Sequence, residues 1–231
     1  MAEQYRDKDL GQIVIVRDAR AKKIIARWRD NAIRLTLPTF YPESKIPAAL
    51  EKMKPRLLAF KPQEKQLFDE GYTLNTFTWD VNIIRGLLTN YYVSLKGRVL
   101  SIICPLDVDF ADSGVQQKIR MYIENALRAE AKRVLPVMLE EHAHRNAFTC
   151  SGVKINKSRT HWGSCTSRKL INLSYYCLLL PPHLISYVLL HELCHTVEMN
   201  HSDRFWNLLD RFTGNKAKLL TQELKNYRTD F

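Results

Sequence analysis

The chain has 231 residues, 45% of them hydrophobic and 26% charged, which is typical of a folded globular protein and excludes a disordered one. Its N-terminal residues carry both charges without a following apolar run, and no stretch reaches the length of a membrane span, so we expect a soluble cytoplasmic protein. The net charge of +11 indicates either a well-solvated basic surface or an anionic partner, such as nucleic acid or nucleotide phosphates.

The first half of the chain is predicted to be rich in strands. Five segments have strand-like composition, over residues 12–17, 22–28, 32–37, 74–84 and 91–103. Turns are expected at residues 29–31 and at Lys96-Gly97, and a helix over residues 44–60. We therefore predict an antiparallel, β-rich N-terminal domain over residues 1–110, without a nucleotide-binding loop.

The second half is predicted to be mainly helical. A long helix begins at Asp112-Ser113 and runs to about His144, because its apolar residues recur at helical spacing. Two short strands and three helices follow, over residues 152–156, 169–174, 182–199, 202–212 and a last segment to about residue 228. The whole chain is thus expected to have an α+β fold, with a catalytic domain over residues 111–231.

The segment His191-Glu192-Leu193-Cys194-His195 carries the strongest indication of chemistry. Two histidines four residues apart on a helix lie on one face, about one turn apart, so both can bind one metal ion. Glu192 stands beside the first ligand, where it can activate a metal-bound water. Two structural histidines are the alternative, but a buried glutamate beside them would be costly without a metal or partner.

A catalytic zinc site usually needs a third protein ligand. The five cysteines are scattered without C-x-x-C spacing, so they do not supply it. His201 is the favoured third ligand, and Asn200 is expected to turn the chain back in a left-handed conformation. Asp210 and Glu223 are the alternatives. Glu198 stands where the metzincin pattern requires glycine, which argues against that class.

A basic stretch leads up to the predicted catalytic helix, because no acidic residue occurs between Glu141 and Glu192. Its cations predict a phosphate-binding surface, for which Lys157, Arg159 and Arg168 are the candidates. Asn172 is a further candidate for substrate binding, and the 169–174 strand could offer an edge to an extended peptide.

Several blocks of the chain together resemble the YgjP-like family of small bacterial proteins, classed as zinc metallopeptidases. They are T-H-W-G-S-C at 160–165, I-N-L at 171–173, Pro181-Pro182, the H-E-L-C-H helix and N-H-S-D-R-F-W at 200–206. The family is related to the SprT and Wss-type zincin proteases that act on proteins crosslinked to DNA. The resemblance is strongest over residues 150–212, and His161 departs from the arginine or lysine that is more frequent there.

The resemblance implies a zincin-like catalytic domain that holds Zn²⁺ by His191, His195 and His201, with Glu192 as the catalytic residue. The predicted function is hydrolysis of peptide bonds by a zinc-bound water that Glu192 activates. Some family members are catalogued as nucleotide pyrophosphatases, so a metal-dependent nucleoside triphosphate pyrophosphatase is one alternative. A DNA-associated protease or binding module is the other.

Overall fold

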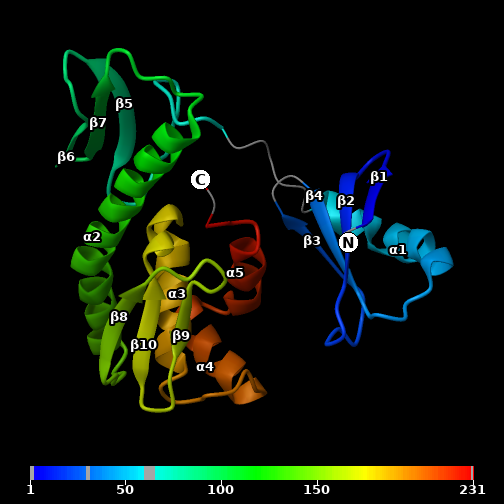
Figure 1. Cartoon of the computed structure of the whole chain (residues 1–231). Helices are drawn as coiled ribbons and strands as arrows, with labels where there is room; N and C mark the ends of the chain where they lie inside the picture. The colour runs from blue at the N-terminus through cyan, green and yellow to red at the C-terminus, as the bar shows by residue number, and fades with distance from the viewer. Residues whose placement is uncertain (1–2, 30–31, 60–65, 230) are drawn as a thin grey trace. The chain divides into compact units, whose positions relative to one another are not determined.

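The fold is described from a computed structural model, for residues 3–29, 32–59, 66–229 and 231 (Figure 1). The chain divides into two compact units, Met1–Lys65 and Gln66–Phe231, each described here by itself. Strands and helices occur in both, so the predicted α+β class is confirmed. Within the described residues, no helix is both long enough and apolar enough to cross a membrane.

The first unit is a four-stranded sheet in the order β1-β2-β4-β3. Its strands are β1 (Glu3–Asp7), β2 (Gly11–Arg17), β3 (Ile25–Arg29) and β4 (Ala32–Leu37). The chain passes from β2 to the edge strand β3 and returns as β4 between them, so β2 and β4 are parallel. The antiparallel arrangement predicted for this region is therefore wrong for that pair. The turn predicted at 29–31 includes residues 30 and 31, which lie outside the described residues.

A helix covers one face of this sheet. After the short helix η1 (Glu43–Lys45), α1 (Ile46–Ala59) presents buried Ile46, Leu50 and Leu57 to the sheet. Alternate residues of the central strands, including Ile13 and Ile33, form the other half of this core. In addition, the indole Nε1 of Trp28 donates to the Leu57 carbonyl at 2.8 Å. This core lies entirely within the first unit.

The second unit begins with a three-stranded sheet in the order β5-β7-β6. Its strands are β5 (Asp80–Gly86), β6 (Tyr92–Lys96) and β7 (Val99–Pro105). The turn predicted at Lys96-Gly97 joins β6 to β7, and Gly97 has a φ of 58°. Again the first and last strands, β5 and β7, are parallel rather than antiparallel.

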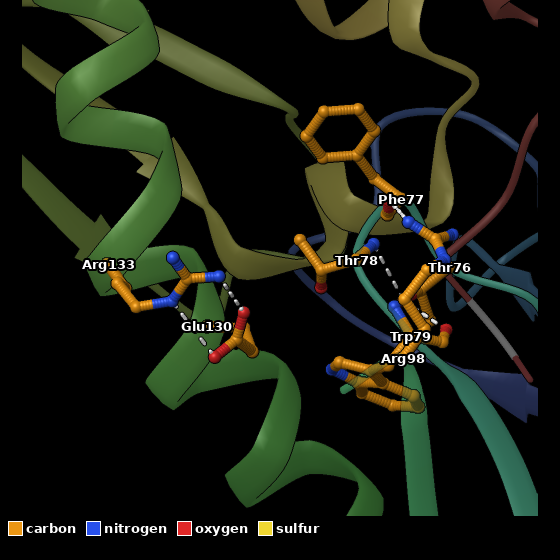
Figure 2. A network of polar contacts seen from close by, with 7 residues as sticks. All are labelled: Thr76, Phe77, Thr78, Trp79, Arg98, Glu130 and Arg133. Atoms are coloured by element: carbon orange, nitrogen blue, oxygen red, sulfur yellow. Dashed lines mark hydrogen bonds and ion pairs between the residues drawn. The ribbon is translucent and has the colours of Figure 1, made fainter. Parts of the chain in front are cut away.

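The strand predicted to begin at residue 74 begins only at residue 80, because a polar turn precedes it (Figure 2). The Thr76 hydroxyl donates to the Trp79 carbonyl at 2.6 Å and accepts from the Trp79 backbone N–H at 3.0 Å. Arg98 Nη1 also donates to the Phe77 carbonyl at 3.3 Å. Figure 2 shows these residues near α2, where Arg133 pairs with Glu130 one turn earlier. The turn fixes the fully buried Trp79 at the start of β5.

The long helix α2 (Ser113–Arg145) closely matches its predicted range. The Asp112 carboxylate caps it by accepting from the Val115 N–H at 2.8 Å. Buried residues recur every four positions along one face; they are Ile119, Ile123, Leu127, Ala131, Leu135, Leu139 and Ala143. This stripe shares one core with Ile83, Leu100 and Ile102 of the preceding sheet. For that reason the boundary between the units falls well before the predicted one near residue 110.

The remaining elements surround a second small sheet, in the order β8-β10-β9. They are β8 (Gly152–Asn156), β9 (Gly163–Cys165), β10 (Leu170–Ser174), η2 (Tyr175–Leu179), α3 (Pro182–Cys194), α4 (Asp203–Thr213) and α5 (Ala217–Leu224). In the view of Figure 1, α3 passes behind this sheet. Helix α3 is buried almost all round, which is typical of a central core helix. The predicted edge at 169–174 is wrong: β10 is the middle strand, and β9 forms the edge.

Candidate metal centre

Three histidine rings converge at the end of α3. His191 lies in its last turn, and His195 follows the helix in helical conformation, with φ −66° and ψ −15°. Their Nε2 atoms are 3.2 Å apart, and the Nε2 of His201 is 3.0 Å from that of His191. The metal-binding atoms of the three rings all lie within 4.8 Å of one another.

These spacings fit a bound metal ion. Tetrahedral zinc with nitrogen ligands at about 2.0–2.1 Å holds those nitrogens about 3.3 Å apart. Hydrogen bonds alone explain the cluster poorly, since a neutral ring has one N–H and His191 Nε2 would need to pair with both neighbours. The Nδ1–H of His195 donates to the Glu198 carbonyl at 3.0 Å, which leaves its Nε2 free as a ligand. The residues present therefore suit a three-histidine metal site.

The chain reverses between His195 and His201 by a series of tight turns. The Thr196 backbone N–H and hydroxyl both donate to the Leu193 carbonyl, at 2.9 and 2.7 Å. These bonds end α3 at Cys194, five residues before the predicted end at Met199. Asn200 is not among the described residues with positive φ, so the left-handed turn predicted there is wrong.

The histidine rings rest on the aromatic ring of Phe205. Phe205 is fully buried in the first turn of α4, and Ser202 caps that helix as its sequence predicts. The ring stacks on His195 with 4.4 Å between centroids and an interplanar angle of 24°. It also meets His191 at 4.9 Å and His201 at 4.7 Å. Phe205 thus fixes all three rings, a role its position in the sequence did not reveal.

Burial keeps the two helix histidines uncharged. Burial, with the neighbouring His195 and His201, lowers the pKa of His191 to about 3. The pKa of His195 is likewise lowered, mainly by burial. At neutral pH both rings are therefore neutral, which is the form that binds a metal ion.

The carboxyl group of Glu192 lies buried beside this cluster. Its side chain points toward β9, where a Cβ built on Gly163 would lie 2.7 Å from the Glu192 Oε1. Burial raises the pKa of Glu192 to about 8, and its Oε2 has no partner among the described residues. A buried carboxyl oxygen without a partner is costly, so the site is arranged for a polar group that the protein itself does not provide.

The contact between Gly163 and Glu192 makes a testable prediction. We expect Gly163→Ala to destabilise the chain by about 1–3 kcal/mol, because the new methyl group must displace the Glu192 carboxyl. Hydrolytic activity should fall with it. Thermal unfolding and an activity assay would measure both effects. Gly71→Ala is the matched control, since the nearest atom to its Cβ is 3.4 Å away. Equal behaviour of the two variants would contradict the prediction.

A cleft of about 510 Å³ opens beside His191 and Glu192. One wall is the segment 160–163 that leads into β9, and the other is α5 with the residues after it. The floor belongs to α3, whose Tyr187 hydroxyl is 2.7 Å from the Thr221 hydroxyl of α5. Apolar side chains that line it are Trp162, Val188, Leu224 and Tyr227. The cleft can therefore accept apolar side chains of a substrate next to the histidines.

The predicted substrate-binding residues do not line this cleft. Arg159 is held by Glu124 at 2.6 Å and by the Tyr176 hydroxyl at 3.0 Å. Asn172 on β10 approaches the Ser164 hydroxyl of β9 at 3.4 Å. Lys157 and Arg168 are exposed, and within the described part of the chain none of the four candidates lines the cleft.

The alternative third ligands are engaged elsewhere. The Asp210 carboxylate accepts from the Ala217 N–H at 2.9 Å, next to the start of α5. Glu223 pairs with His183 at 2.7 Å. Neither belongs to the cluster of candidate ligands that the described residues form, so His201 remains the favoured third ligand.

The chain is similar to known proteins at two levels, a family model and a solved structure. A family model described as YgjP-like, metallopeptidase domain, matches residues 22–227. Among solved structures, the crystal structure of the metallopeptidase zymogen of Pyrococcus abyssi abylysin is similar at 22% identity and a TM-score of 0.36. The match covers 40% of this chain and 94% of that one. No curated protein matches the sequence.

Proposed function

We propose that the chain, which belongs to the YgjP-like metallopeptidase family, is a zinc-dependent peptidase with Glu192 as its general base. The match to the family model confirms the resemblance seen in the sequence. The family membership makes it a metallopeptidase-like hydrolase. The observation that carries the finer proposal is the convergence of three imidazole nitrogens beside a buried carboxyl oxygen without a partner among the described residues.

In this proposal, His191, His195 and His201 hold the metal. A zinc ion held there would lower the pKa of a water molecule to about 7 and would polarise the carbonyl of the substrate. A cation held beside Glu192 would keep its carboxyl group ionised, so that it can accept a proton from the attacking water and deliver it to the nitrogen that leaves when the C–N bond breaks. The burial of Glu192 keeps bulk water away from this transfer.

The edge of β9 supports a peptide as the substrate. Within the described residues β9 pairs only with β10, so its other edge can add an extended chain by backbone hydrogen bonds. That edge begins at Gly163, in the wall of the cleft next to Glu192. The cations predicted as phosphate clamps do not line the cleft, which favours peptide over nucleotide hydrolysis.

Metal removal tests the proposal. The purified chain is expected to contain about one zinc ion, to cleave casein, to lose that activity on chelation and to regain it when zinc is added back. Elemental analysis and a casein assay measure the two quantities on the same sample. Chelator-resistant cleavage would contradict the metal role. A metal-loaded chain that cleaves no peptide but releases pyrophosphate from nucleoside triphosphates would replace this function with the alternative.

A further inference from the structure

One face of the sheet in the first unit carries a group of arginines. Because residues alternate along a strand, the side chains between the core positions of β2, β3 and β4 point away from α1. The arginines at such positions are Arg27, Arg29 and Arg34, and Arg6 of β1 lies on the same face, opposite Gln12 of β2. All four are exposed, and we call them the arginine face. Arg27 and Arg34 lie directly opposite each other on adjacent strands. Arg29 follows Arg27 on the same face.

This arrangement is unfavourable for the protein alone, because like charges directly opposite on neighbouring strands repel. Among the described residues, none of the four arginines forms an ion pair. Three carboxylates of the unit, those of Asp7, Asp9 and Glu51, gather instead around Lys54 of α1, at 3.5, 2.6 and 3.2 Å. The repulsion is thus left for an external anion to offset.

Charge is also concentrated in this unit. Residues 1–65 contain 15 lysines and arginines against eight acidic residues, a net charge of +7 out of +11 for the chain. Arg27, Arg29 and Arg34, together with Asp18, line a hollow of about 210 Å³. The Asp18 carboxylate accepts from the Arg20 backbone N–H at 2.8 Å. Three guanidinium forks around one hollow suit phosphate oxygens, which they can bind in pairs.

We propose that the arginine face binds the phosphate backbone of duplex DNA. Duplex DNA carries about one negative charge per 1.7 Å of its axis, about twice the density of an extended, fully acidic peptide at about 3.3 Å per residue. The aromatic residues Tyr5 and Trp28 alternate onto the opposite face, so the arginine face offers no described ring for stacking bases. Recognition is therefore directed at phosphates and is independent of base sequence.

This surface is independent of the proposed peptidase site. Its residues belong to the first unit, whereas the three histidines and Glu192 belong to the second. A failure of peptide cleavage would leave the DNA proposal intact, and the reverse also holds.

Binding of the full-length chain to a short labelled DNA duplex, measured between about 50 and 200 mM salt, tests the proposal. The Arg27→Gln/Arg34→Gln variant should reduce the slope of log affinity against log salt by about 1.8 and weaken binding about 10²-fold at low salt, since each lost phosphate contact removes about 0.9 from the slope. The matched control is Lys52→Gln/Arg56→Gln, which removes two exposed charges from α1. It should bind like the wild type.

One further variant and a measurement of thermal unfolding sharpen the result. Arg27→Lys/Arg34→Lys keeps both charges and should keep most of the salt slope. The glutamine variant should unfold at an unchanged or higher temperature, because it removes the repulsion between the two strands. Equal weakening by both glutamine pairs, an unchanged slope, or tighter binding to phosphatidylserine vesicles than to DNA would overturn the proposal.

Discussion

Replacement of Glu192 by glutamine is expected to lower kcat for peptide cleavage by about 10²–10⁴-fold while the metal stays bound. Glutamine keeps the shape of the side chain beside Gly163 but cannot take a proton from water. The three histidines that would hold the metal remain unchanged. Steady-state kinetics on a peptide substrate and the zinc content of the same preparation measure the two effects. Glu140→Gln, an exposed change on α2, is the control.

The same variant separates catalysis from folding. The buried Glu192 carboxyl has an oxygen without a partner among the described residues, so its replacement by a neutral amide should not lower the unfolding temperature. A stable, metal-loaded variant with wild-type activity would remove Glu192 from the mechanism. A variant that loses both metal and stability would instead indicate a structural role.

The parts of the site that are local in sequence could be predicted from it. Helical geometry alone brings His191 and His195 together, because residues four apart share one face. Ser202 as the cap of α4 was equally readable, since capping depends on neighbouring residues. The placement of His201 beside them depends on a short reversal of the chain, for which the sequence indicated the wrong turn residue.

Contacts between distant segments could not be predicted in this way. Strand β9 has only three residues, too few for a strand pattern, yet it supplies the wall against Glu192 through Gly163. The polar composition of β1 hid that strand as well. The alternation of apolar and polar residues marks a strand but does not specify which strands lie next to it. It therefore predicts neither the central position of β10 nor the parallel pairing of β2 with β4 and of β5 with β7.

The arginine face shows the same division between local pattern and pairing. Composition alone predicts a phosphate-binding surface between Glu141 and Glu192, because that stretch lacks acidic residues, and it does not single out the arginines of the first unit. Only the pairing of β3 with β4 places Arg27 opposite Arg34. In the second unit, Arg159 is instead neutralised by Glu124. The strand register, rather than the number of cations, thus distinguishes a surface open to anions from a structural ion pair.

The other large effect is expected from His201→Ala, which removes the candidate ligand that lies beyond the turns after α3. We expect zinc affinity to fall by more than about 10²-fold. Removal of a group that only hydrogen-bonds to a metal ligand already lowers metal affinity by about 10–100-fold, and here the ligand itself is lost. Peptide cleavage should fall with it at limiting zinc. Because His201 is exposed, the metal-free variant should unfold at the same temperature as the metal-free wild type. His144→Ala, another exposed histidine, is the control.

Thermal unfolding with and without zinc makes this test decisive. A ligand that binds only the folded state stabilises it by RT ln(1 + [L]/Kd), so the wild type should gain stability with zinc and His201→Ala should lose most of that gain. His195→Ala is less informative, because it also opens a cavity against Phe205. Retention of the full gain by His201→Ala would transfer the third-ligand role to Asp210 or Glu223. Each of these would then have to leave its present partner, the Ala217 N–H or His183.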